Sequence, residues 1–75
     1  MTDLERRIRE VLCIPEDKRV LPMERFMGYK SWIGIQASAR ALRDGHAVYG
    51  VVEGDLKVWY GANAEDHANK ILAAQ

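Results

Sequence analysis

The chain has 75 residues and a mass of 8.5 kDa, which allows one small hydrophobic core and leaves too little for a second. Hydrophobic residues make up 48% and charged residues 29%, a balance that excludes an intrinsically disordered chain. Basic and acidic side chains cancel to a formal net charge of zero, so no global field attracts nucleic acid or an anionic membrane. We therefore expect a single compact domain over residues 1–75.

The first predicted element is a helix over residues 3–12. Thr2 and Glu5 have the spacing of a capping box, in which each side chain accepts a hydrogen bond from a free backbone amide. Pro15 is expected to end the helix, because the residue before a proline disfavours helical backbone. Cys13 is predicted to be a small buried hydrophobe, since free cysteine is among the most buried residue types. The apolar stripe of this helix consists of Leu4, Ile8, Val11 and Leu12.

The segment from residue 16 to residue 30 allows two interpretations. The apolar residues 20–23 could form a short edge strand that pairs with a later hairpin. Alternatively, Pro22 is suited to the first position of a helix that carries Met23, Phe26 and Met27 at helical spacing. The sequence does not separate these interpretations.

A helix is predicted over residues 31–43, with Ser31 as its N-cap and Asp44-Gly45 as its C-terminal stop. Only three of its side chains, Gln36, Arg40 and Arg43, form a polar stripe. A helix that is apolar over most of its circumference is usually buried, so we expect this one to be the spine of the domain. Its larger apolar face carries Trp32, Ile35, Ala39 and Leu42. A face of small residues, where another backbone could approach closely, carries Gly34, Ala37, Ser38 and Ala41.

Residues 47–60 are predicted to form an antiparallel hairpin. A two-residue turn at Gly54-Asp55 would pair Val51 with Val58, whereas a three-residue turn would shift the register by one. Under the two-residue turn, one face of the hairpin carries Val48, Val52, Lys57 and Trp59, and the other carries Tyr49, Val51, Leu56, Val58 and Tyr60.

A last helix is predicted over residues 64–74, because Asn63 is a suitable N-cap and an apolar line follows it. That line consists of Ala64, Ala68, Ile71 and Leu72. The expected fold class is α+β, with three helices packed on the antiparallel hairpin and a possible third short edge strand. The order is helix, then strand or helix, then helix, strand, strand and helix.

No group of side chains combines into a catalytic, cofactor or metal site. The segment 28–31, Gly-Tyr-Lys-Ser, lacks the glycine spacing of a phosphate-binding loop, and no parallel strand-helix-strand unit is expected around it. His46 and His67 have no converging ligands or catalytic partners. Glu53 and Asp55 flank a turn glycine, where polar residues are common. The sequence therefore predicts a protein that is not an enzyme and binds no cofactor or metal.

A cytoplasmic location is expected. No apolar run approaches the roughly 20 residues of a membrane span, and the N-terminal residues lack the pattern of a secretory signal. A single cysteine cannot form an intrachain disulfide, the usual support of a small secreted domain.

The leading hypothesis for function is a protein-binding module. Tryptophan and tyrosine dominate binding hot spots, and a two-stranded hairpin can bury only one apolar face. The partner would be a larger protein or a second copy of the chain. Phage or mobile-element accessory proteins that inhibit or modulate a host complex by occluding a surface are typical of this size. The predicted contact residues are Trp59, Tyr49, Tyr60, Lys57 and Val52; alternatively, this set belongs to the core.

The second hypothesis is DNA binding through Gln36, Arg40 and Arg43, whose side chains suit bases and phosphates. Together with the order of elements, this stripe resembles a winged-helix DNA-binding domain and implies a small transcriptional regulator. The helix over 31–43 would then be the recognition helix, and residues 53–55 the tip of the wing. The acidic tip, the zero net charge and the apolar helix make nucleic acid the less favoured partner.

Overall fold

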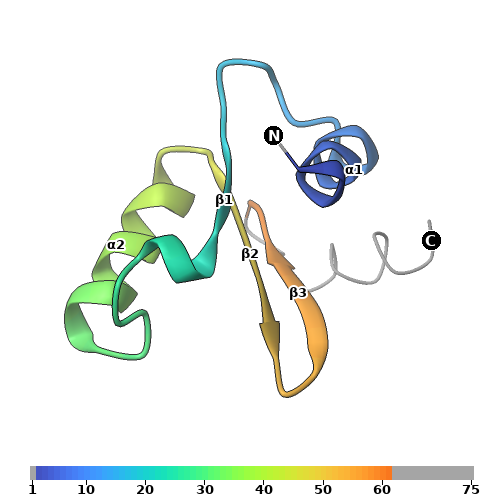
Figure 1. The fold of residues 1–75 in the computed structure, drawn as a ribbon. Coiled ribbons are helices and arrows are strands. Elements are labelled where there is room, and N and C mark those ends of the chain that lie inside the picture. Colours follow the sequence, from blue (N-terminus) through green and yellow to red (C-terminus); the bar gives the residue numbers. More distant parts are fainter. Residues whose placement is uncertain (1, 62–75) are drawn as a thin grey trace.

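A computed structural model describes residues 2–61 of the chain. Its elements are α1 (Asp3–Leu12), β1 (Val20–Pro22), the short 3-10 helix η1 (Met23–Arg25), α2 (Trp32–Arg43), β2 (Ala47–Val52) and β3 (Asp55–Trp59). The two α-helices lie on opposite sides of a three-stranded sheet (Figure 1). The α+β class is thus confirmed, while the helix predicted over 64–74 lies outside the described residues.

The sheet is mixed. Its strand order is β1-β2-β3, with β1 parallel and β3 antiparallel to β2. The edge strand expected near residues 20–23 is β1, where Pro22 is tolerated because edge strands need fewer backbone donors. Parallel neighbours require a crossover connection, which α2 supplies. The expectation of no parallel strand-helix-strand unit around 28–31 was therefore wrong, since a three-residue strand shows no periodic pattern.

The hairpin turn lies one residue earlier than predicted. Val52 pairs with Asp55 and Val48 with Trp59, so the turn residues are Glu53 and Gly54, with φ of 54° and 86°. Positive φ at both positions is typical of a type I′ turn, for which glycine is strongly preferred. The predicted cross-strand pairs were wrong by two residues, and an even shift leaves every side chain on its predicted face.

Helix α1 begins and ends through local backbone chemistry. The Glu5 amide donates to Thr2 Oγ1 at 3.1 Å. At the other end Cys13 adopts left-handed backbone (φ 53°), and the Ile14 amide donates to the Arg9 carbonyl at 3.0 Å, as in a Schellman cap. This cap, which precedes Pro15 in the chain, leaves Cys13 exposed and directs Ile14 inward. The predicted burial of Cys13 was therefore wrong.

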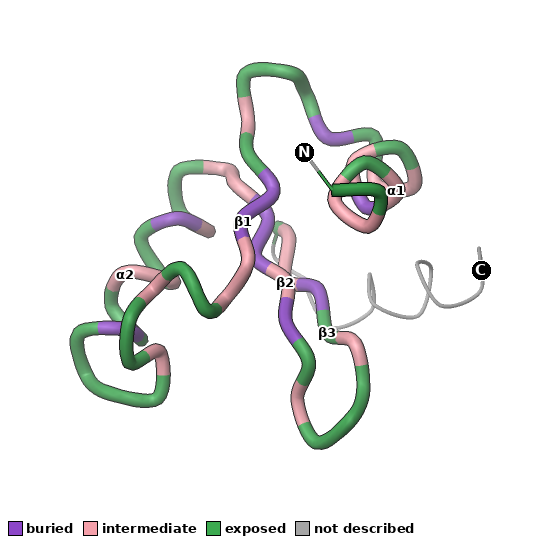
Figure 2. The backbone as a smooth tube through the Cα atoms, in the orientation of Figure 1, coloured by how far each residue is buried: buried purple, intermediate pink, exposed green. Residues whose placement is uncertain are grey.

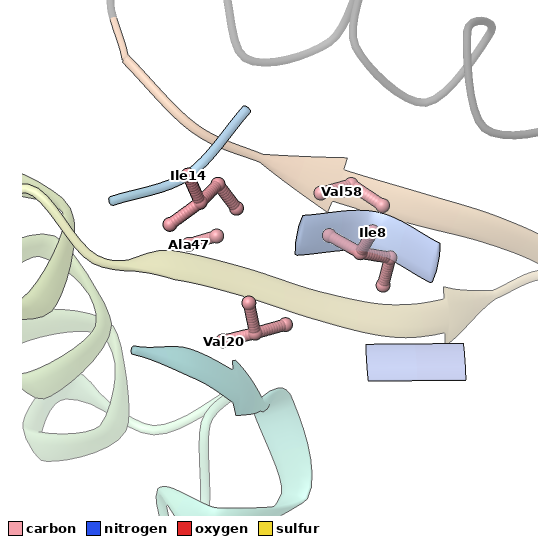
Figure 3. Packing of buried hydrophobic residues seen from close by; sticks show 5 residues of the cluster. All are labelled: Ile8, Ile14, Val20, Ala47 and Val58. Carbon is pink, nitrogen blue, oxygen red and sulfur yellow. The ribbon is translucent and has the colours of Figure 1, made fainter. Parts of the chain in front are cut away.

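The larger cluster of buried side chains lies between α1 and the sheet (Figure 3). Ile8 of α1 is fully buried, and its partners come from the loop after α1 and from all three strands. The cluster consists of Ile8, Ile14, Val20, Ala47 and Val58. Partly buried Tyr49, Leu56 and Tyr60 pack around it, while Val51 at the hairpin end of the same face is 60% exposed.

The smaller cluster lies between α2 and the other face of the sheet, and consists of Leu21, Ala41 and Val48. Only Gly34 and Ala41 of α2 are buried, and most of this helix is exposed or intermediate in Figure 2. The expected buried spine was therefore wrong, because one small sheet contacts only one side of α2. Within residues 2–61, neither helix has the length and apolar character needed to cross a membrane.

Candidate functional site

An apolar groove runs between α2 and the sheet. Helix α2 packs on β2 and makes only sparse contact with β3, which leaves the α2 side of β3 open. The groove has a volume of about 260 Å³, below the roughly 300–1,000 Å³ typical of small-molecule sites. Its lining residues are Met23, Tyr29, Ile35, Ser38, Ala39, Leu42, Val48 and Trp59.

Large apolar side chains are also exposed at the start of α2 and just before it. The exposed fractions are 90% for Met27, 72% for Trp32, 75% for Ile33 and 51% for Ile35. Ser31 Oγ caps the helix by accepting from the Gly34 amide, and Gly34 itself is the buried residue of the first turn. Gly34 faces the preceding turn, close to Gly28 and Tyr29, while Trp32 and Ile33 stay exposed and Ile35 lies at the groove. Such a concentration of exposed apolar side chains is typical of an interaction surface.

The predicted contact residues are divided between the two faces of the sheet. Trp59 lines the groove, and it joins Val52 and Lys57 around an adjoining hollow of about 220 Å³. Tyr49 and Tyr60 pack instead against the cluster under α1. Trp59 itself packs against the buried cluster under α2, as do Met23, Phe26 and Leu42. The structure thus places three of the five residues together and two on the opposite face.

The polar stripe of α2 has the exposure that its sequence predicted. Gln36, Arg40 and Arg43 are all exposed, and with Ala39 they line a shallow hollow. Ala39 also lines the apolar groove, so the two surfaces adjoin. Within the part of the chain that the structure describes, no ion pair is seen for either arginine.

The exposed apolar residues of α2 were not among the predicted contact residues, because a helix with so large an apolar surface was expected to be buried. The signal that could have identified them is the apolar circumference of the helix beside a sheet of only three short strands. A sheet of that size cannot cover both sides of a helix, so one side has to face solvent or a partner.

The side chains of His46 and Arg9 form hydrogen bonds to the backbone of loops. His46 Nδ1 accepts from the Arg19 amide at 3.0 Å, which helps join the loop before β1 to the start of β2. The Arg9 guanidinium donates to the Pro15 and Lys18 carbonyls, both at 2.8 Å, and thereby holds the loop after α1. Residues 2–61 contain no cluster of three metal-ligating side chains; His67 lies outside them.

Tyr49 links α1 to β2, since its hydroxyl donates to Glu5 Oε1 at 2.8 Å. Burial, with the adjacent Glu5 carboxylate, raises the pKa of Tyr49 from 10.0 to about 12. A raised folded-state pKa adds stability that is complete below pH 10 and is lost as pH rises through about 12. We expect Tyr49→Phe to flatten this alkaline loss, as measured by urea unfolding across that pH range. The same change at Tyr29 is the control, and equal pH slopes for all three proteins would contradict the prediction.

Comparison with known proteins gives no relative: no protein-family model matches the chain, and no curated protein or solved structure is significantly similar to it. The functional argument therefore rests on the surfaces of this chain.

Proposed function

We propose that this protein is a small protein-binding module that acts by occluding or bridging a surface on a larger partner. The observation that carries the proposal is the apolar groove between α2 and β3, which includes the exposed Ile35, together with the exposed Trp32 and Ile33 at the start of the same helix. Exposing large apolar side chains to water is unfavourable by roughly 25 cal/mol per Å². A partner that covers them recovers this free energy, and aromatic residues are the usual anchors of such contacts.

The groove suits a row of partner side chains better than a small substrate. Its lining is mainly apolar, with Ser38 and the hydroxyl of Tyr29 as polar groups. The acidic side chains that the sequence offered for chemistry, Glu53 and Asp55, lie at the far end of the hairpin and are exposed. An apolar lining without a convergent acid, base or nucleophile supports binding rather than catalysis.

The test compares two matched substitutions during affinity capture from host lysate. Ile35→Asp places a charge in the groove, whereas Val51→Asp places one at the hairpin tip, on the other face of the sheet; the two side chains are 51% and 60% exposed. We expect a groove partner to be lost with Ile35→Asp and retained with Val51→Asp, with both variants folded by circular dichroism. Equal capture by both variants would contradict the groove as the contact surface.

DNA binding is the second candidate, supported by the exposed and adjoining Gln36, Arg40 and Arg43. Binding through these arginines should weaken steeply as salt rises and fall with Arg40→Ala or Arg43→Ala. Two observations favour the protein partner. First, the tip of the hairpin carries Glu53 and Asp55 and is therefore acidic. Second, a helix-turn-helix has a full helix before its recognition helix, whereas among the described residues only the three-residue η1 lies between β1 and α2.

A further inference from the structure

The α2 side of the groove has large side chains at its ends and small ones in its middle. Ile35 and Leu42 lie at the two ends, and Ser38 and Ala39 lie between them. These four residues are spaced i, i+3, i+4 and i+7, so they share one side of the helix over about 10 Å. Trp59 of β3 lines the facing side. The small pair leaves a notch that one large apolar side chain of a partner can fill.

A notched groove of this length suits a helix better than a strand. Two turns of a partner helix present apolar side chains at i, i+4 and i+7 in one row, which packs into a groove beside another helix. An added strand needs free backbone donors and acceptors. The groove offers side chains instead, because its floor is the face of a sheet whose strands pair with each other.

Both sides of the groove carry basic side chains. On the α2 side, Arg40 and Arg43 line a hollow that shares Ala39 with the groove. On the β3 side, Lys57 lines a hollow that shares Trp59 with it. All three basic residues are exposed, and within residues 2–61 no ion pair is seen for them. None of the described residues that line the groove or these two hollows is acidic.

We infer that the element of the partner that enters this groove is an amphipathic helix whose apolar stripe is flanked by acidic side chains. The apolar stripe covers the floor, and the acidic flanks lie opposite Arg40 and Arg43 on one side and Lys57 on the other. Such complementary charges select a partner and fix its register. Nucleic acid would match the basic side chains but leave the apolar floor uncovered. This inference rests on the proposed function and names the part of the partner that binds.

The test is a selection from a display library of helical peptides, with the full chain as the immobilised target. Every peptide carries leucine at i, i+4 and i+7, and the positions that flank this stripe vary among glutamate, glutamine and lysine. We expect peptides with glutamate flanks to be enriched at least about tenfold over those with lysine flanks. An Ile35→Asp target should enrich none of them.

Reversing the charge of the target tests the role of the arginines. With Arg40→Glu and Arg43→Glu combined, the same library should enrich lysine flanks in place of glutamate. Arg6→Glu is the control, because Arg6 is an exposed arginine of α1, on the opposite side of the sheet. Its selection should match that of the parent chain. Glutamate flanks selected by the doubly reversed target would overturn the assigned charge contacts.

Filling the notch tests the shape of the groove. Ala39→Leu should lower the affinity of the best selected peptide at least about tenfold, as measured by fluorescence anisotropy. Gln36→Leu places the same side chain on the exposed side of α2, outside the lining of the groove, and should leave the affinity unchanged. Unchanged affinity with Ala39→Leu would overturn the notch as the anchor site.

The remaining outcomes separate this inference from the proposed function. If no peptide is enriched on the parent chain over Ile35→Asp, both fail. If the enriched peptides have basic or uncharged flanks, the proposed function stands and the acidic partner is overturned. Duplex DNA that binds the parent and is lost with Arg40→Glu, in the absence of a selected helix, would assign the arginines to nucleic acid. A dimer of the parent chain that is lost with Ile35→Asp would assign the groove to a second copy. Either result would overturn the acidic helix.

Discussion

Ile8→Ala should destabilise the protein by about 2–5 kcal/mol, the range for truncating a buried isoleucine and leaving a cavity. Ile8 is fully buried and contacts the cluster that joins α1 to the sheet. For a domain of this size, such a loss lowers Tm by about 8–40 °C. Urea unfolding followed by circular dichroism measures the change in the free energy of unfolding.

The matched control is Ile33→Ala, which removes the same atoms from a side chain that is 75% exposed. Alanine favours helix slightly over isoleucine, so this variant should unfold within about 0.5 kcal/mol of the parent protein. Equal losses at the two positions would contradict the placement of the core under α1. A large loss at Ile33 alone would mean that the exposed start of α2 is covered in the folded protein.

Gly34→Ala is the second substitution with a large expected effect. The informative result is whether it raises or lowers the free energy of unfolding. In an unconstrained helix, alanine is more stable than glycine by about 1 kcal/mol. At Gly34, however, an added Cβ would lie 2.2 Å from the Gly28 carbonyl oxygen and 2.3 Å from Tyr29 Cα. Both are backbone atoms, so the turn before α2 has to move. We expect a net destabilisation of about 1–3 kcal/mol, as for other overpacked sites.

Ala39→Gly is the reference for this prediction, because Ala39 is an exposed position of the same helix. The decrease in the free energy of unfolding caused by Ala39→Gly, measured with urea, gives the difference in helix stability between glycine and alanine in α2 without a steric conflict. If Gly34→Ala stabilised the protein by a similar amount, the close approach of the turn 28–31 to α2 would be refuted. The NMR signals of Tyr29 and Ser31 should shift in Gly34→Ala and remain in place in Ala39→Gly.

Local patterns were sufficient where neighbouring residues determine the structure. The bounds of α1 follow from Thr2 and the apolar stripe, and those of α2 follow from its N-cap Ser31 and its stop at Asp44. The face on which each hairpin side chain lies was also predictable, because alternation has a period of two. The exact turn was not, since Glu53-Gly54 and Gly54-Asp55 are both acceptable two-residue turns in sequence.

The candidate site was predictable only in part. Trp59 and Lys57 were identified from composition and hairpin alternation, and the structure places them on one face with Val52. Tyr49 and Tyr60 could not be separated from them, because the choice depends on where α1 packs. The small sheet indicates that one side of α2 stays uncovered, but the sequence does not show that this side carries Trp32 and Ile33, since an apolar helix surface looks the same whether a sheet or a partner covers it.

The sequence by itself determined the α+β class, the helices over 3–12 and 31–43, the faces of the hairpin and the small-residue face of α2 around Gly34. Tertiary structure decided that β1 joins β2 in parallel, that Cys13 is exposed, and that α2 lies on one face of the sheet with a groove beside β3. The physical reason is the separation along the chain between the residues that interact. Caps, turns and periodicity act between residues a few positions apart, whereas the side of an apolar helix that becomes buried depends on the area that distant strands provide.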